Sequence, residues 1–184
     1  MSLKGLEQVI ANLNIISNTA VPRASAQAVN RVATRAVSRS VAVVSKDTRV
    51  PRKLVKQRAR IKRATAKKPM AMIRVNRGNL PAIKLGTASV RLSRRKRDKK
   101  GANSVLRIGP FRFHGAFIQQ LENGRWHVMR RTSRPRYPIE VVSIPLAAPL
   151  TTAFKDELPK LMESDMPKEL RASLKNQLRL ILKR

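Results

Sequence analysis

The sequence predicts an α+β fold in which helices at both ends of the chain flank a small antiparallel β-sheet. Apolar residues recur at helical spacing up to residue 66 and again from residue 146, and short β-branched or alternating runs fill the stretch between them. Apolar residues make up 42% of the 184, enough to bury a core. We expect a single domain over residues 1–184, helical over 1–66, β-rich over 67–145 and helical over 146–184.

The N-terminal part predicts two helices. The first carries apolar residues at helical spacing, namely Leu6, Val9, Ile10, Leu13 and Ile16. Pro22 suits the first turn of the second, which extends to about Lys46. One stripe of this Ala- and Val-rich helix consists of small residues, namely Val29, Val32, Ala33, Ala36, Val37, Ser40, Val41 and Val44. Its arginines lie mostly off the stripe, which predicts an amphipathic helix with a positive outer side.

A short basic helix is expected next, over residues 51–63. Val50 precedes Pro51 and is driven out of the α region, so one helix stops and another restarts there. Leu54, Val55 and Ile61 give the new helix a thin apolar seam, and nearly all its other positions are cationic.

Short runs bounded by Gly, Pro and Asn predict strands at residues 70–75, 82–85, 89–92 and 104–108. Between the last two, residues 93–104 are expected to form a mobile basic hairpin loop. Asn123-Gly124 between two β-like runs indicates a further hairpin, and residues 139–144 suit another strand.

Two helices are expected at the C-terminal end. An apolar pattern at helical spacing runs from about Ala147 to Met162, and Pro167 opens the last helix. On that helix an apolar face lies opposite a basic one. The apolar face is expected to contain Leu170, Leu174, Leu178, Ile181 and Leu182, and the basic face Arg171, Lys175, Arg179 and Lys183.

The charge balance points to a polyanionic partner. The chain has 41 Lys and Arg against 10 Asp and Glu, a net charge of +31, and no acid between Thr48 and Arg97. Nucleic acid is the leading candidate, bound through its phosphate backbone, because only 3% of residues are aromatic and no helix-turn-helix or zinc-finger pattern is present. The candidate DNA-contact residues are Arg49, Arg52, Lys53, Lys56, Arg58, Arg60, Lys62, Arg63, Lys67, Lys68, Arg94, Arg95, Lys96, Arg97, Lys99 and Lys100.

No catalytic, cofactor or metal site is predicted. Cys is absent, and the two histidines, His114 and His127, lack partners at metal-ligand spacing. The acids near Pro167, among them Asp165 and Glu169, suit a helix N-terminus. A secretory signal and a run of about 20 apolar residues are both missing, so we expect a soluble protein made in a cytoplasm, with no membrane partner.

Several stretches together resemble the minor tail protein Z family of lambda-like phages and prophages. Each motif alone is unspecific, but their order and spacing match almost from end to end. The stretches are Lys4-Gly5-Leu6-Glu7-Gln8 with Thr19-Ala20-Val21-Pro22, Arg52-Lys53-Leu54-Val55-Lys56 with Arg58-Ala59-Arg60, Val75-Asn76-Arg77-Gly78-Asn79-Leu80-Pro81, Gly115-Ala116-Phe117-Ile118-Gln119-Gln120-Leu121 with Asn123-Gly124-Arg125-Trp126-His127-Val128-Met129, and Pro149-Leu150-Thr151-Thr152-Ala153-Phe154.

The resemblance implies a non-enzymatic virion protein at the head-proximal end of a long non-contractile tail, assembled in the host cytoplasm. It implies a homo-oligomeric ring, with a hexamer favoured, that helps to position the DNA end for ejection. Implied partners are the phage DNA end, the tail terminator, head-completion proteins and the tape-measure protein. The family supplies no catalytic motif, so the DNA-contact residues above rest on charge alone.

Two other classes of function stay open at this point. A ribosomal-type RNA-binding protein would also be small, basic and free of cysteine, and would bind structured RNA as a monomer. A nuclease would need metal-dependent turnover, which the scattered carboxylates argue against. The basic segments are also compatible with contacts to acidic neighbouring proteins in place of DNA.

Overall fold

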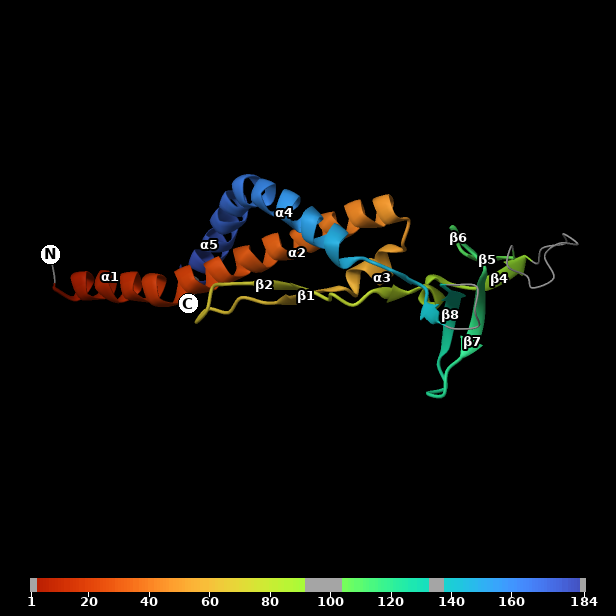
Figure 1. The fold of residues 1–184 in the computed structure, drawn as a ribbon. Coiled ribbons are helices and arrows are strands. Elements are labelled where there is room, and N and C mark those ends of the chain that lie inside the picture. The colour runs from red at the N-terminus through yellow and green to blue at the C-terminus, as the bar shows by residue number, and fades with distance from the viewer. Residues whose placement is uncertain (1–2, 92–103, 133–137, 183–184) are drawn as a thin grey trace, which may run out of the picture. The chain divides into compact units, whose positions relative to one another are not determined.

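The computed structural model describes residues 3–91, 104–132 and 138–182 (Figure 1). Helices and antiparallel strands are both present, which confirms the α+β class. Contacts divide the chain into two compact units. Unit 1 comprises Met1–Val43, Lys56–Asn76 and Leu150–Arg184, and unit 2 comprises Val44–Val55 and Arg77–Pro149. The single domain stays a prediction. Of the basic loop expected over residues 93–104, only Ser104 is among the described residues.

The two N-terminal helices of unit 1 are joined without a break. Helix α1 (Leu3–Ile15) continues through a π-helical turn, η1 (Ile16–Ala20), into α2 (Val21–Thr48). The Val21 N–H donates to the Ile16 carbonyl five residues back. Pro22, which lacks an N–H and crowds the preceding turn, follows at once, and the wider turn accommodates it. The proline therefore marks a π turn within one continuous helical run.

Helix α2 buries a ridge of small residues at every fourth position. Its members are Ala20 just before the helix and then Ala24, Ala28, Val32, Ala36 and Ser40. The predicted small-residue stripe is confirmed, with Val29 half-buried and the others buried. Leu161 of α4 (Ala147–Ser164) packs with Val32 and Ala36 in the core of unit 1. Ser40 Oγ donates to the Ala153 carbonyl of α4 at 3.3 Å, so the ridge allows a close approach of the two helices.

The most buried positions of the last helix, α5 (Met166–Leu182), lie off the predicted leucine face. Leu170 is 41% exposed, and the buried positions are polar, namely Glu169, Ser173 and Gln177. The predicted leucine face is partly buried, with Leu174 and Leu178 half-buried, and the described part of the predicted basic face is exposed. Ion pairs of Glu169 with α2 draw the polar side inward. The Leu182 side chain and Lys183 lie outside the described part of the chain.

Unit 1 also contains an antiparallel hairpin of β1 (Ala59–Lys62) and β2 (Met72–Val75). The predicted basic helix over residues 51–63 is wrong beyond α3 (Arg52–Lys56). Residues 59–62 alternate half-buried and exposed, a period of two that fits a strand and not a helix. The Asn76 N–H extends the pairing by donating to the Arg58 carbonyl at 2.8 Å.

Unit 2 holds three small antiparallel sheets with the strand orders β10-β3, β4-β5-β6 and β7-β8-β9. Their core includes Val50, Val55, Leu106, Ile108, Val128 and Leu146. The strands are β3 (Leu80–Pro81), β4 (Ala88–Arg91), β5 (Val105–Ile108), β6 (Phe111–His114), β7 (Ala116–Gln120), β8 (Trp126–Arg131), β9 (Ile139–Val141) and β10 (Ser143–Ile144).

Two details of unit 2 differ from the sequence prediction and one agrees. The predicted strand at residues 82–85 is a 3₁₀ helix, η2 (Ala82–Leu85), because its buried residues Ala82 and Leu85 are three apart and share one side of that helix. Strand β6 was missed, although Gly109 at φ 53° forms the tight turn that leads into it. The hairpin at Asn123-Gly124 is confirmed between β7 and β8, with Gly124 at φ 73°.

Candidate nucleic-acid interface

One side of the β1–β2 hairpin and its connecting segment is lined with exposed cations. This hairpin basic face consists of Arg60, Lys62 and Arg74 on the strands, with Lys67 and Lys68 exposed in the connecting segment. Arg63 is exposed too, but it lies beside Asn30 and Arg35 of α2. The strand period of two turns Arg60 and Lys62 to solvent, while Ala59 and Ile61 are half-buried on the other side. Thr65 and Lys68 exchange backbone hydrogen bonds of 2.9 and 3.0 Å in the connection, which fixes the segment that presents Lys67 and Lys68.

Two arginines stand directly opposite each other on this face. Arg60 of β1 is the register partner of Arg74 of β2, so their side chains leave the same side of the hairpin. Like charges in directly opposed positions destabilise a strand pair. Among the described residues, no carboxylate forms an ion pair with any member of the hairpin basic face. The face therefore has a concentrated positive charge that an external anion would relieve.

The inner side of the hairpin is fixed to α2. Asn30 Nδ2 donates to the Ala64 carbonyl at 2.9 Å, and the Ala64 N–H donates back to Asn30 Oδ1 at 2.8 Å. Ile73 of β2 packs on the core cluster that contains Val32 and Leu161. These contacts hold the hairpin along α2, as Figure 1 shows, and leave its basic side facing away from the core.

A second group of predicted residues lies in unit 2. Arg49 has a positive φ of 57°, an uncommon conformation for a residue other than glycine, and it links α2 to the segment before α3. Val50 and Val55 are fully buried on either side of Arg52 and Lys53. As a result, Arg49, Arg52 and Lys53 are all exposed.

The remaining predicted residues are divided between unit 1 and the undescribed part of the chain. Lys56 is exposed and Arg58 is half-buried, both in unit 1 just before β1. The candidates of the basic loop lie outside the described residues, namely Arg94, Arg95, Lys96, Arg97, Lys99 and Lys100.

Further cations that the sequence analysis missed gather on the β4–β5–β6 sheet. Arg107 is paired with Ser89 on one side and with Arg112 on the other, so all three share a face. Arg91 and His114, two residues along their strands, share it too, and all the basic members of this sheet arginine face are exposed. They line a hollow of about 300 Å³. The alternation of exposed and half-buried residues along β6 would have predicted this face from the sequence, had that strand been recognised. The same alternation along Met72–Val75 would have predicted that Arg74 is exposed.

Three arginines of α2, Arg31, Arg35 and Arg39, belong to a different class, because they form ion pairs with Asp165 and Glu169. Arg35 contacts Asp165 at 2.9 Å and Glu169 at 2.5 Å, and Arg31 contacts Glu169 at 3.0 Å. Hydrogen bonds from Ser164 and Arg35 lower the pKa of Asp165, and a hydrogen bond from Arg31 lowers the pKa of Glu169. The pKa of Arg35 is raised, chiefly by its hydrogen bond to Asp165. Glu169 does lie in the first turn of α5, as expected, but both acids also tie α5 to α2.

Comparison with known proteins identifies the family. Residues 3–184 match the family described as Prophage minor tail protein Z (GPZ). The chain belongs to the minor tail protein Z family. It is 91% identical over 184 residues to the "Tail completion protein" of Escherichia phage N15 and 57% identical over 192 positions to the "Tail completion protein Z" of Escherichia phage lambda, with 100% of each chain covered in both cases. No solved structure matches the chain.

In this member of the minor tail protein Z family, no group of three or more His, Cys, Asp or Glu among the described residues is arranged to hold a metal ion. None of the described helices is long and apolar enough to cross a membrane. The exposed basic faces, whose members form no ion pair among the described residues, are the candidate functional surface in that part of the chain.

Proposed function

We propose that this protein is a structural component of a phage virion, where it completes the tail at its head-proximal end. The support is similarity over the full chain to two proteins named as tail completion proteins. In this role it is not an enzyme, and it is assembled in the host cytoplasm. Its neighbours are other tail and neck proteins, for which the tail terminator, the head-completion proteins and the tape-measure protein are candidates.

We further propose that the hairpin basic face holds the end of the phage DNA through nonspecific phosphate contacts. The observation that carries this proposal is the opposed pair Arg60 and Arg74, which has no neutralising acid among the described residues. Phosphates spaced along a duplex offset such a charge, and each contact releases counterions. The exposed cations of unit 2, including Arg49, Arg52 and Lys53, are proposed as separate phosphate contacts.

The proposed assembly is a homo-oligomeric ring, with a hexamer favoured, whose basic faces are directed toward the DNA. A ring places several copies of each face around one duplex, so weak contacts add up through multivalency. The ribosomal-type RNA binder is set aside, because the relatives named above are tail proteins.

The test is duplex DNA binding over a salt series with the double variant Arg60→Glu and Arg74→Glu. Loss of two phosphate contacts should reduce the slope of log K against log salt by about 2 and weaken binding to all sequences alike. The matched control is Arg171→Glu with Lys175→Glu, which changes the net charge equally at two exposed positions of α5. Equal losses in both variants would show that net charge, and not the hairpin, governs binding.

A further inference from the structure

Helix α1 carries an apolar stripe that nothing in the described chain covers. Its members are Leu6, Val9, Ile10 and Leu13, each between 51% and 61% exposed. Their spacing of three and four residues places them on one face of the helix, and every residue from 6 to 15 is exposed. Four large apolar side chains exposed side by side form the kind of patch that marks an interaction surface. The stripe therefore needs a partner surface.

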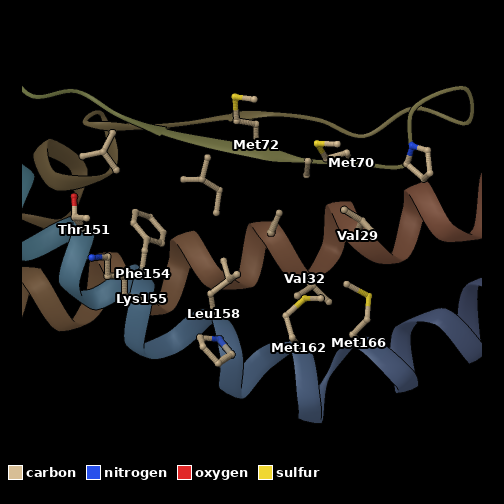
Figure 2. Close-up of a pocket in the computed structure, with 16 residues that line it drawn as sticks. Val29, Val32, Met70, Met72, Thr151, Phe154, Lys155, Leu158, Met162 and Met166 are labelled. Carbon is tan, nitrogen blue, oxygen red and sulfur yellow. The ribbon is translucent and has the colours of Figure 1, made fainter.

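An open apolar groove in unit 1 has the complementary character. It measures about 830 Å³ and is lined by, among others, Val32, Met70, Met72, Phe154, Leu158 and Met162. Figure 2 shows the side chains of the β1–β2 hairpin on one side, those of α4 on the other and α2 between them. Met70 is 69% exposed. Because methionine adapts to irregular shapes, this methionine groove suits the apolar face of a helix.

The groove is out of reach of α1 in the same chain. Helix α1 passes through η1 into α2 without a break, and the groove begins at Val29 of α2. Leu13 and Val29 are 16 residues apart, or about 24 Å along a helix. Figure 1 shows α1 continuing away from the other elements of unit 1. The occupant must therefore come from another molecule.

We propose that the α1 stripe of one copy of this chain binds in the methionine groove of the next copy. Charge favours this occupant, because the chain has a net charge of +31 but the segment from position 5 to 22 contains no Lys or Arg. Glu7 is the one charged residue of that segment. Among the residues that line the groove, Lys155 is the one charged residue, of opposite sign to Glu7. Two copies can meet here without the repulsion that their basic surfaces would cause.

Length also fits. The groove follows α4 from Thr151 to Met162, about 16 Å of helix, and the stripe from Leu6 to Leu13 spans about 10 Å. Each copy contributes two different surfaces, so the contact is head-to-tail and repeats until a ring closes. The inference supplies the subunit contact of the proposed ring, and it rests on the proposed function only for that closure.

The test mixes two variants of the full chain. Leu13→Asp disables the stripe, and Met162→Asp disables the groove, both at exposed positions where the fold, monitored by circular dichroism, should persist. The wild type should self-associate in sedimentation velocity, each variant alone should be monomeric, and an equimolar mixture should form dimers only, because one intact stripe and one intact groove remain. Self-association of Met162→Asp alone would overturn the proposal, since the stripe would then bind elsewhere. A wild type that stays monomeric, or a mixture that forms no dimers, would overturn it as well.

Cross-linking gives an independent readout, because the chain has no cysteine. A Leu13→Cys chain mixed with a Met162→Cys chain should yield a disulfide-linked heterodimer under mild oxidation. The control replaces the second chain with Lys175→Cys, an exposed position on α5 away from the groove. Equal yields in both mixtures would contradict the contact. Failure here leaves the salt-dependent DNA binding of the hairpin basic face untouched, so the two proposals fail separately.

Discussion

Asn30 and Ala64 are joined by two hydrogen bonds of 2.9 and 2.8 Å, in which the side-chain amide of α2 matches the backbone of the hairpin connection. The two residues are 34 positions apart in sequence, and their pairing fixes where the hairpin lies on the long helix. Through it, the rigid α2 positions a surface of opposed arginines. The proposed DNA contact therefore depends on Asn30, a neutral residue that positions the hairpin and is not itself proposed to contact DNA.

Replacement of Asn30 by Ala should destabilise the protein. The change removes both hydrogen bonds and leaves the N–H and carbonyl of the buried Ala64 without these partners, at a cost of about 1–3 kcal/mol. Urea unfolding measures the change. The control is Asn176→Ala at an exposed position of α5, which should change stability by less than about 0.5 kcal/mol. Equal effects of the two substitutions would contradict the role of Asn30.

The free energy of unfolding should decrease at low pH, because Asp165 and Glu169 become protonated and lose their ion pairs. Their pKa values are lowered in the folded state from ordinary values of 3.8 and 4.5, so the unfolded chain binds protons first. The stabilisation is complete above the unfolded values and is lost as pH falls from about 4.5 through the lower folded values. Thermal unfolding at a series of pH values measures this loss.

The matched comparison for the acid dependence uses two double variants. Asp165→Asn with Glu169→Gln removes the ion pairs and should flatten the pH dependence below about 4.5. Glu122→Gln with Glu163→Gln changes the net charge equally at exposed positions. It should leave the dependence close to that of the wild type. A similar flattening in both would show that total charge, and not the pairs with Arg31 and Arg35, sets the acid sensitivity.

Substitution of Arg74 by Glu should separate stability from binding. An opposite charge facing Arg60 replaces a repulsive pair with an attractive one, worth about 0.2–1 kcal/mol of added stability. The same change should weaken DNA binding, because it removes a phosphate contact and adds a repulsive charge. Urea unfolding and DNA titration on the same samples test both effects, with Arg74→Gln expected to be intermediate in each. A variant that binds DNA as tightly as the wild type would contradict the proposed interface.

Overpacking the α2 ridge should be costly. Ala28 is fully buried, so Ala28→Leu should destabilise by about 1–3 kcal/mol. The control Ala11→Leu adds the same atoms to an exposed position of α1 and should be nearly neutral. Urea unfolding compares them. A tolerated leucine at position 28 would mean that the helices packed on the ridge can move apart.

The sequence predicted the fold class, the long helix with its small-residue stripe and the Asn123-Gly124 hairpin, because each has a local pattern. It failed where two patterns overlapped. The run from Ala59 to Arg63 contains apolar residues compatible with a helix, but pairing with Met72–Val75, a contact distant in sequence, selects the strand. The polar buried side of α5 was likewise hidden, because Glu169 is buried only through its arginine partners on α2.

Part of the candidate site followed from charge alone and part did not. The acid-free stretch pointed to Arg60, Lys62, Arg63, Lys67 and Lys68. All five are exposed, and the strand period places Arg60 and Lys62 on one face. Arg74 and the sheet arginine face were missed, since their positions follow from strand register. The division of cations into paired ones on α2 and unneutralised ones on the hairpin also required the structure, because Asp165 and Arg35 are 130 residues apart.

A photo-cross-linking amino acid at position 60, placed in assembled virions, tests whether the hairpin basic face touches the end of the phage DNA. We expect cross-links to the terminal segment of the genome, and none when the same group replaces Arg171 on the exposed side of α5. Cross-links from position 60 to neighbouring tail proteins alone would contradict DNA contact and assign the basic charge to protein partners.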